Sequence, residues 1–427
     1  MTSFTAETFQ NEFLPAGTGE VDAIVTVTAT GAPAQAVAGP PATGRTEVII
    51  VDRSGSMGGS RIAAARKATI AAVESIPDGT HFAVIAGDHA AEVVVGLTEA
   101  GPASRAQAKQ RIQRIQAEGG TVMSSWLTTA ATLFDRRPGA INHAILLTDG
   151  RNEGEERSVL DSALAAVTGR FQCDCRGVGT NWVVDELRHI STALLGTVDI
   201  VAQPADLAAD FTSMINAAMR RTTADVRLRV WTPAGATLSF VKQVAPQVDD
   251  LTGRRTEVNA RTVDFATGAW SAESRDYHVS VTVPPGEVGG ERLAARVSVV
   301  TTGGDGDEQV AAQALIRAVW TDDDALSTQL NRQVAHYTGQ AELAQVIAEG
   351  LAARSAGDDR TATVKLGRAA QLAAASGNAA TSELLEKVVE VEDAATGTVR
   401  LRRGVQAADE MALDTRSTRT VRVGKRD

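Results

Sequence analysis

The sequence predicts a doubly wound α/β domain with a mostly parallel sheet, inserted next to a β-sandwich and followed by a C-terminal α-helical hairpin or bundle. Three observations predict this architecture. Strand and helix patterns alternate with short connections across residues 45–221, which is typical of a parallel sheet with helices on both faces. Residues 222–321 are short strand patterns separated by Pro and Gly turns. Residues 322–395 carry apolar residues at three- and four-residue spacing, as packed helices do.

The N-terminal segment supplies a strand to this scheme. The chain of 427 residues is longer than one hydrophobic core usually supports, so several domains are expected. Residues 21–30 (VDAIVTVTAT) alternate β-branched with small or polar residues, and the Ala/Pro/Gly-rich stretch after them is typical of a linker. Because this strand has no similar neighbour nearby in the sequence, we expect it to pair with the later strands. Residues 1–44 would then be part of the sandwich, and residues 396–427 form a basic C-terminal tail.

Composition excludes several classes of protein. A formal charge of −10 argues against a nucleic-acid binder, since attraction to phosphates needs a basic surface. The first residues carry no basic cluster followed by an apolar run, and no apolar stretch reaches membrane-spanning length. We therefore expect a cytoplasmic protein without membrane insertion. Cys173 and Cys175 lie at strand spacing, which favours plain strand residues in a reducing compartment over the remnant of a two-ligand metal site.

The stretch VIIVDRSGSMGGSRI places three oxygen side chains directly after a buried strand. Asp52, Ser54 and Ser56 alternate in the loop beyond the carboxyl end of the domain's first strand. Alternate residues of an extended loop project in the same direction, so the three side chains can converge on one point. The glycines between and after them permit a sharp turn into the next helix.

Two further oxygen side chains follow other elements of the same domain. Asp149 comes directly after the fourth strand (HAILLT), and Thr121 follows two glycines at the start of a helix. In the common strand order 3-2-1-4-5-6, strands 1 and 4 are adjacent and flank the switch point where ligands bind. The sequence therefore predicts that five oxygen side chains from three segments gather at one edge of the sheet.

This set resembles the Rossmann-like von Willebrand factor A (VWA) domain and its metal-ion-dependent adhesion site, known as MIDAS. The matching residues are Asp52, Ser54 and Ser56 (the D-x-S-x-S element), Thr121 and Asp149. The resemblance implies that the two serine hydroxyls bind the metal directly, that the threonine does so in the ligand-competent state, and that the aspartates act largely through water. It also implies an open coordination position for an Asp or Glu carboxylate of a partner protein.

The ligand chemistry indicates a hard cation. All five candidates are oxygens without His or thiolate, which favours Mg²⁺, with Ca²⁺ or Mn²⁺ as alternatives, over Zn²⁺ or Cu²⁺. A turn rich in Asx and Ser caps would explain the first segment but would leave Thr121 and Asp149 without a reason. We therefore expect a non-catalytic scaffold that captures an acidic side chain of a partner through the metal.

Two other functions stay open. A metal-dependent hydrolase using the same site would need a general acid or base, and the candidates are His89, His143, Glu153 and Glu155. His143 begins an apolar strand and is expected to be structural, while His89 lies in a turn. The glutamates are expected to rim the site or to be solvated. We therefore do not expect an enzyme, and the last alternative is a signalling adaptor that acts through its helices and tail.

The whole chain and its tail suggest further relationships. Sandwich strands on both sides of an inserted A domain resemble bacterial cytosolic A-domain proteins related to inter-alpha-trypsin inhibitor heavy chains. In the tail, Thr418 and Thr420 are flanked by Arg and each is followed at +3 by Val. This pattern resembles substrates of bacterial Ser/Thr kinases and ligands of forkhead-associated domains. The alternatives are a disordered, solvated basic tail or an edge strand.

Overall fold

The structure is a computed structural model that describes residues 2–31, 44–302 and 307–423. It divides into two compact units, each described by itself. The α/β unit comprises residues 44–224 and 268–271, and the sandwich–helical unit comprises the remaining described residues. Most of the predicted linker after the first long strand lies outside the described residues.

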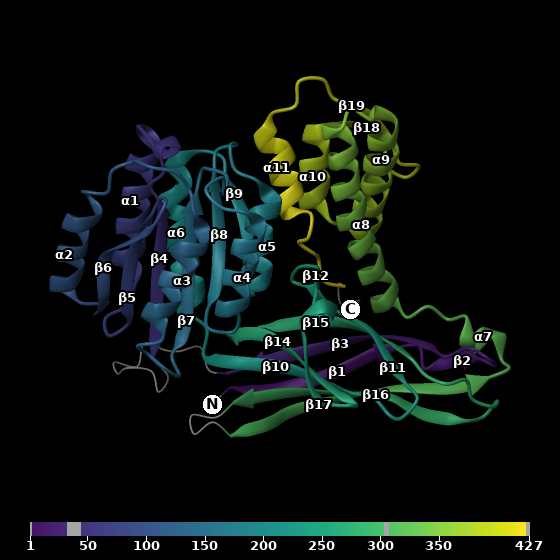
Figure 1. The fold of residues 1–427 in the computed structure, drawn as a ribbon. Helices are drawn as coiled ribbons and strands as arrows, with labels where there is room; N and C mark the ends of the chain where they lie inside the picture. The colour runs from purple at the N-terminus through teal and green to yellow at the C-terminus, as the bar shows by residue number, and fades with distance from the viewer. Residues whose placement is uncertain (1, 32–43, 303–306, 424–427) are drawn as a thin grey trace. The chain divides into compact units, whose positions relative to one another are not determined.

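The α/β unit is built on one six-stranded sheet (Figure 1). Its order is β6-β5-β4-β7-β8-β9, which is the predicted 3-2-1-4-5-6, and every neighbouring pair is parallel except β5 with β6. The strands β4, β7 and β8 are almost wholly buried, as near-continuous apolar runs in a covered parallel sheet should be. The strand bounds are β4 Arg45–Asp52, β5 His81–Gly87, β6 Ala91–Glu99, β7 Ile141–Thr148, β8 Gln172–Val178 and β9 Val198–Val201.

Helices cover both faces of this sheet (Figure 1). On one face α1, α2 and α6 share a single apolar core with the sheet, which includes Ile49, Ile62, Ile112 and Phe211. On the other face α3, α4 and α5 follow one another as neighbours. The helix bounds are α1 Ser60–Ser75, α2 Pro102–Ile112, α3 Met123–Phe134, α4 Arg157–Val167, α5 Val184–Ala193 and α6 Leu207–Met219.

The sandwich consists of two mainly antiparallel sheets, in which the short β2 pairs parallel to β17. One has the order β1-β3-β15-β11-β12 and the other β13-β14-β10-β16-β17-β2. The N-terminal β3, which contains the predicted strand 21–30, is hydrogen bonded to β15, so strands from both sides of the α/β unit share one sheet. The bounds are β1 Ser3–Gln10, β2 Phe13–Pro15, β3 Glu20–Thr30, β10 Thr223–Trp231, β11 Thr237–Ala245, β12 Asp249–Asp250, β13 Arg255–Asn259, β14 Thr262–Trp270, β15 Ser274–Thr282, β16 Glu291–Thr302 and β17 Glu308–Thr321.

Helices follow the sandwich, and they complete the predicted fold class, which is confirmed. The long helices α8 and α9 pack against each other, and Leu343, Ile347, Leu366 and Leu385 belong to their common core. Side chains cap the starts of α7, α8, α9 and α10; the Asn331 amide oxygen, for example, accepts hydrogen bonds from the backbone amides of Gln333 and Val334 in α8. The helix bounds are α7 Asp324–Ser327, α8 Arg332–Ser355, α9 Asp359–Ser376, α10 Ala379–Val388 and α11 Ala407–Arg416.

Two expectations about the C-terminal part are wrong. The helix predicted to run through VVEVED stops at Val388, because the alternating Val residues form β18 (Val389–Asp393), which pairs with β19 (Thr398–Leu401). The disordered alternative for the tail is also wrong as far as Val423, because the chain forms α11 and then an extended segment that reaches this residue. This segment is held by contacts with residues distant in the sequence: Val421 N–H donates to Gln340 Oε1 at 2.8 Å, and Val248 N–H donates to the Thr418 carbonyl at 2.7 Å.

Within residues 2–31, 44–302 and 307–423, no helix is both long enough and apolar enough to cross a membrane.

Candidate metal centre

The loop after β4 arranges the first three predicted side chains. Asp52 is the last residue of β4 and is fully buried. The backbone N–H of Ser54 donates to Asp52 Oδ1 at 2.7 Å, and the hydroxyls of Ser54 and Ser56 lie 3.0 Å apart. The chain then enters α1 through Gly59, whose φ of 72° is in the left-handed region that favours glycine. The three side chains therefore converge as the alternating sequence predicted.

Asp149 joins this group from the neighbouring strand. Because β4 and β7 pair in parallel register, with Val51 opposite Leu147, their carboxyl ends lie level. The Ser56 hydroxyl donates to Asp149 Oδ1 at 2.6 Å, and the Asp149 side chain is fully buried. One hydroxyl therefore links the loop after β4 to the carboxylate after β7.

Thr121 completes the group around Gly150. A Cβ atom added at Gly150 would lie 3.4 Å from Ser56 Oγ, 3.4 Å from Thr121 Oγ1 and 3.8 Å from Asp52 Oδ2. Oxygens from two of the three predicted segments thus border one small volume that the missing side chain of Gly150 leaves free, and the Ser56 hydroxyl links them to Asp149 of the third segment. The structure therefore brings together every residue predicted for this site.

The electrostatics of the group favour a bound positive charge. Burial raises the pKa of the Asp52 carboxyl to about 6, and the nearby Asp149 carboxylate adds to the shift. Hydrogen bonds from Thr148 and Ser54 oppose this shift. Two buried carboxylates close together repel each other, so a cation between them would be stabilised.

The residues present fit a hard divalent cation. Two carboxylates and three hydroxyls are the oxygen donors that Mg²⁺, Ca²⁺ and Mn²⁺ prefer. In the described part of the chain, no three His, Cys, Asp or Glu side chains cluster as a metal site. A cation at this group would therefore depend on the hydroxyls of Ser54, Ser56 and Thr121, and water or a partner would fill its remaining positions.

Comparisons with known proteins assign the family. The model of the von Willebrand factor type A domain matches residues 47–200, and that of the von Willebrand factor type A C-terminal domain matches residues 371–417. The solved structure of a von Willebrand factor type A protein from Catenulispora acidiphila is 48% identical in sequence. The match covers 99% of this chain and 97% of that one, with a TM-score of 0.93. The chain belongs to the von Willebrand factor type A family. We call its α/β unit the VWA domain.

More distant relatives share parts or the fold. The ArnB paralog VWA2 from Sulfolobus acidocaldarius has the same fold at 14% identity, with a TM-score of 0.61 and coverage of 99% of this chain and 100% of that one. Human inter-alpha-trypsin inhibitor heavy chain H4 is 32% identical over 143 residues, which are 31% of this chain and 15% of that protein. A protein of Synechocystis sp. is 26% identical over 209 residues, and the match spans about half of each chain (48% and 49%). The resemblance to the heavy chains is thus distant and partial.

Two residues of the VWA domain that contact the site were not predicted. The Arg61 guanidinium lies in the first turn of α1, and its Nη1 is 2.5 Å from Asp149 Oδ2. The Thr148 hydroxyl donates to Asp52 Oδ2 at 2.5 Å. Thr148 could have been found from its place at the end of β7, next to Asp149. The sequence does not indicate the contact of Arg61 with Asp149, because the direction of the Arg61 side chain depends on the rotation of α1 about its axis.

A second loop of the VWA domain holds the segment that carries Thr121. Glu155 Oε1 accepts a hydrogen bond from the backbone N–H of Ser124 at 3.0 Å, and Oε2 accepts one from the Ser124 hydroxyl. Asn152 Nδ2 donates to Glu155 Oε1 at 2.7 Å, and Gly154 N–H donates to the Thr121 carbonyl at 3.0 Å. Glu155 is therefore not a solvated side chain, which was one of the two expectations for it, because its carboxylate caps the start of α3.

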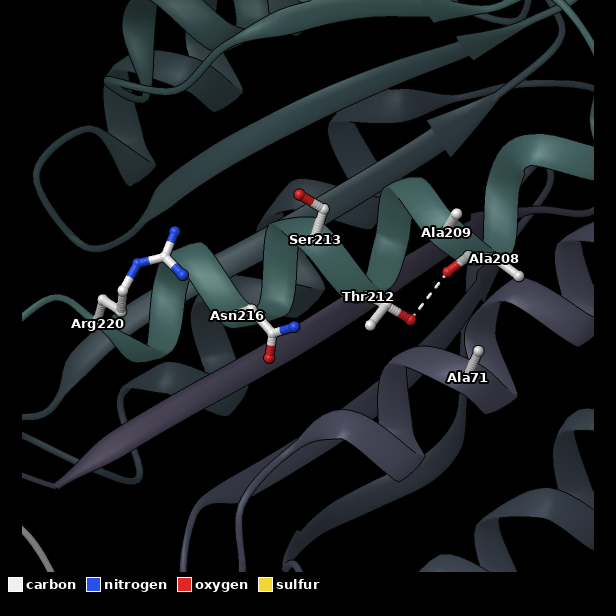
Figure 2. A pocket seen from close by; sticks show the side chains of 7 residues that line it. All are labelled: Ala71, Ala208, Ala209, Thr212, Ser213, Asn216 and Arg220. Atoms are coloured by element: carbon white, nitrogen blue, oxygen red, sulfur yellow. Dashed lines mark hydrogen bonds between the residues drawn. The ribbon is translucent and has the colours of Figure 1, made fainter. Parts of the chain in front are cut away.

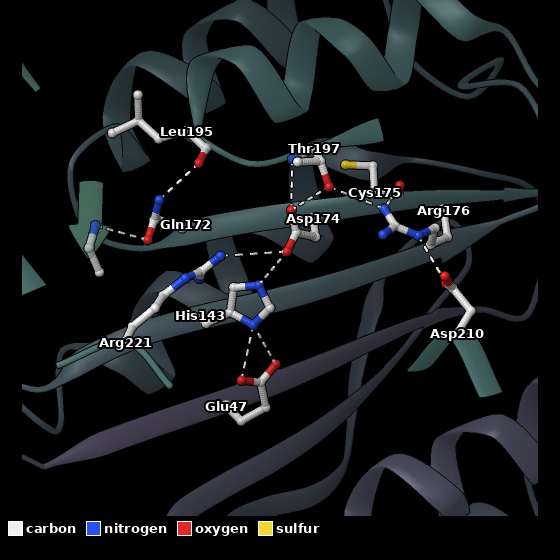
Figure 3. A network of polar contacts seen from close by, with 11 residues as sticks. Glu47, His143, Gln172, Asp174, Cys175, Arg176, Leu195, Thr197, Asp210 and Arg221 are labelled. Atoms are coloured by element: carbon white, nitrogen blue, oxygen red, sulfur yellow. Dashed lines mark hydrogen bonds and ion pairs between the residues drawn. The ribbon is translucent and has the colours of Figure 1, made fainter. Parts of the chain in front are cut away.

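The two candidate histidines have other partners. His89 lies in the turn between β5 and β6, and its Nε2 accepts a hydrogen bond from Gly120 N–H at 3.0 Å. His143 is buried near the start of β7 in a polar network (Figure 3). Its Nδ1 is 2.8 Å from Glu47 Oε1, and its Nε2 is 2.9 Å from Asp174 Oδ2. Both positions match the predicted turn and structural roles.

Other features of the VWA domain lie outside the group of five oxygens. Cys173 and Cys175 are free, buried residues of β8. A cavity between α1 and α6 is lined by small and polar residues, and the labelled side chains in Figure 2 include Ala71, Thr212 and Asn216. None of the predicted metal-site residues lines this cavity.

Proposed function

We propose that the VWA domain is a metal-dependent, protein-binding scaffold. A divalent cation, Mg²⁺ in the first place and Ca²⁺ or Mn²⁺ as alternatives, would be held by Asp52, Ser54, Ser56, Thr121 and Asp149. A partner protein would offer an Asp or Glu carboxylate to the open position of the cation. The observation that carries this proposal is the convergence of Ser56, Thr121 and Asp52 oxygens around the free volume at Gly150.

The hydrogen bonds of the site suit this role. The Ser56 hydroxyl donates its proton to Asp149 and accepts the proton of the Ser54 hydroxyl, so its remaining lone pair is free for a cation. Asp52 is oriented by Ser54 and Thr148 in the same way. When bound, the cation supplies a positive charge that attracts an anionic ligand. Neutral hydroxyl ligands leave much of that charge available to the incoming carboxylate.

We propose that the site binds and does not catalyse. A hydrolase would need a proton carrier beside the metal. Three of the four candidates are engaged elsewhere: His89 accepts from Gly120, His143 lies between two buried carboxylates, and Glu155 caps α3. The fourth, Glu153, is exposed to solvent. These contacts support a scaffold over a metal-dependent hydrolase. We further propose that the scaffold works in the bacterial cytoplasm.

The first test is cation binding by the full chain. Calorimetric titration with Mg²⁺ and Mn²⁺ should show one site, which Asp52→Ala abolishes and Thr121→Ala weakens. Ser125→Ala is a matched control, because the Ser125 hydroxyl donates to the Val122 carbonyl within α3 and stays out of the site. Equal affinity for all variants would overturn the site assignment.

The second test is partner capture. The immobilised full chain is incubated with native lysate in Mg²⁺, in chelator, and as the Thr121→Ala variant in Mg²⁺. Thr121→Ala leaves the net charge unchanged, so a purely electrostatic contact should respond to salt and not to this substitution. We expect a set of proteins captured only by the unchanged chain in Mg²⁺. Identical capture in the three conditions would remove the scaffold proposal.

A further inference from the structure

Asp149 has a cationic partner within the chain. Its side chain is 0% exposed, and Arg61 Nη1 lies 2.5 Å from its Oδ2. The same Nη1 donates to the Ser56 carbonyl at 3.1 Å, while the Ser56 hydroxyl donates to Asp149 Oδ1. Both carboxylate oxygens of Asp149 are thus engaged in this structure. The guanidinium is anchored to the very residues proposed to hold the metal.

The position of Arg61 makes this pair different from a surface ion pair. Exposed ion pairs are screened by water and contribute little. A carboxylate without solvent contact, close to a second buried carboxylate, is strongly unfavourable unless a positive charge compensates it. The Arg61 side chain is 33% exposed, so it can leave Asp149 and return to water without unfolding α1.

Arg53, which directly follows Asp52 in the sequence, provides a comparison with Arg61. It forms ion pairs with Asp88, Glu92 and Glu118, at 2.7, 2.7 and 3.5 Å. These pairs involve residues of the β5–β6 region and of the segment before Thr121, and the ion-pair partners of Arg53 do not include the five side chains of the candidate metal site. Arg53 thus carries the same charge as Arg61 and lies within the D-x-S-x-S element, but its ion pairs are made with other carboxylates.

We propose that Arg61 is the internal counter-cation of the metal site and a positioning residue that sets its affinity. In the metal-free chain its guanidinium neutralises Asp149 and keeps the two buried carboxylates compatible with folding. A divalent cation bound at the same oxygens has to compete with the guanidinium for Asp149. Arg61 therefore weakens metal binding and stabilises the metal-free state. This inference rests on the metal site proposed above.

The experiment compares three full-chain variants: Arg61→Gln, Arg61→Lys and Arg53→Gln. For each, Mg²⁺ and Mn²⁺ affinity is measured by calorimetry, and the unfolding midpoint is measured in chelator and in Mg²⁺. Arg61→Gln removes a charge-assisted hydrogen bond that competes with the metal for Asp149. Its affinity for Mg²⁺ should therefore be about tenfold higher than that of the unchanged chain. Its midpoint in chelator should fall below that of the unchanged chain, and Mg²⁺ should restore it. Arg53→Gln removes an equal charge and should leave the affinity near its original value.

Arg61→Lys keeps the charge and serves if the glutamine variant does not fold in chelator. Lysine is a point charge without the guanidinium fork. The Mg²⁺ affinity of Arg61→Lys should therefore lie between those of the unchanged chain and Arg61→Gln. Equal affinities of the unchanged chain, Arg61→Gln and Arg61→Lys would overturn the inference but leave the metal site intact. An affinity gain in Arg53→Gln as large as in Arg61→Gln would also overturn it. If the unchanged chain and every variant bind no cation, the proposed function itself fails.

Discussion

The hydroxyl of Thr148 donates a hydrogen bond to Asp52 Oδ2 at 2.5 Å, from the last residue of β7 to the last residue of β4. The Ser54 N–H donates to the other oxygen, Oδ1, so hydrogen bonds orient both oxygens of the buried Asp52 carboxylate. Thr148 Oγ1 also accepts from Gly150 N–H at 3.1 Å. One hydroxyl therefore fixes a predicted metal ligand and the backbone at the free volume beside it.

Replacing Thr148 by Val should destabilise the metal-free VWA domain. The substitution keeps the shape but removes the hydroxyl that bonds to Asp52 Oδ2 and to the Gly150 N–H, a loss of about 1–3 kcal/mol. The free energy of unfolding in chelator, from denaturant titration of the full chain, measures it. Thr148→Ser keeps the hydroxyl and should lie much closer to the unchanged chain. If the Val and Ser variants unfold alike, the Asp52–Thr148 bond has no energetic importance.

Gly150→Ala should weaken cation binding while leaving the fold intact. The new methyl group would sit at van der Waals distance from Ser56 Oγ, Thr121 Oγ1 and Asp52 Oδ2, so it fits the folded chain. It would occupy space that a cation and its waters need, and Mg²⁺ tolerates little distortion of its octahedron. We expect about tenfold weaker Mg²⁺ binding, equivalent to about 1.4 kcal/mol. Gly96→Ala, where nothing lies within 4 Å, is the control; a parallel loss there would contradict the assignment.

Glu155→Ala should loosen the segment that carries Thr121. It removes the carboxylate that accepts from the Ser124 N–H at the start of α3, and such caps contribute about 1 kcal/mol. Both the free energy of unfolding and the Mg²⁺ affinity should fall. Glu156→Ala is the matched control, because Glu156 is exposed and makes no side-chain cap at α4. Unchanged Mg²⁺ affinity in Glu155→Ala would show that Thr121 is positioned without this clamp.

The buried network around His143 predicts a pH dependence of stability (Figure 3). Burial disfavours the imidazolium, but the Glu47 carboxylate and the bonds to Asp174 and Glu47 outweigh it, so the pKa of His143 is raised. Because the pKa of His143 is higher in the folded chain than in the unfolded chain, protonation of His143 stabilises the fold. This stabilisation is complete below the unfolded pKa of about 6.5. That contribution is lost as the pH rises through the folded pKa.

Unfolding of the VWA domain should therefore become easier as the pH rises above about 6.5. His143→Gln should remove this part of the pH dependence and cost about 3–5 kcal/mol near pH 6, because it removes the cationic partner of the buried Glu47 carboxylate. Asp174 keeps Arg221, whose Nη2 lies 3.8 Å from its Oδ2. Denaturant titrations of both proteins at several pH values measure the effect. A parallel pH profile in the two proteins would show that His143 is neutral in the folded chain.

The sequence predicted most of the site because its main residues follow strand ends. Asp52 and Asp149 come directly after apolar runs, and the 3-2-1-4-5-6 order places those ends side by side. Arg61 and Glu155 act through the direction of single side chains on a helix and a loop, which periodicity does not fix. The C-terminal segment escaped prediction for a related reason. Its bonds, such as Val421 to Gln340, join residues far apart in the sequence and leave no local pattern.

The contacts of that C-terminal segment bear on the predicted phosphorylation of Thr418 and Thr420. The Thr420 hydroxyl donates to the Val244 carbonyl at 2.7 Å, and the Thr420 N–H donates to the Pro246 carbonyl at 3.0 Å. Phosphorylation would replace the hydroxyl proton of Thr420, which donates to the Val244 carbonyl, by a negatively charged group. This group would repel the carbonyl oxygen, so the segment should detach. Thr418 is held through its backbone carbonyl, which a side-chain modification leaves in place.

Thr420→Asp should therefore release the segment, and Thr418→Asp should not. The reporter is the Val421 N–H, which donates to Gln340 Oε1 at 2.8 Å and should be protected from hydrogen exchange in the unchanged chain. Loss of protection in Thr420→Asp alone would support phosphorylation of Thr420 by a Ser/Thr kinase as the event that releases the tail, which a forkhead-associated domain would then bind. Thr420→Val removes the hydroxyl hydrogen bond without adding a negative charge. It should loosen the segment less than Thr420→Asp does, because it adds no repulsion against the Val244 carbonyl. Equal protection of Val421 in all these variants would mean that phosphorylation at Thr420 does not control the segment.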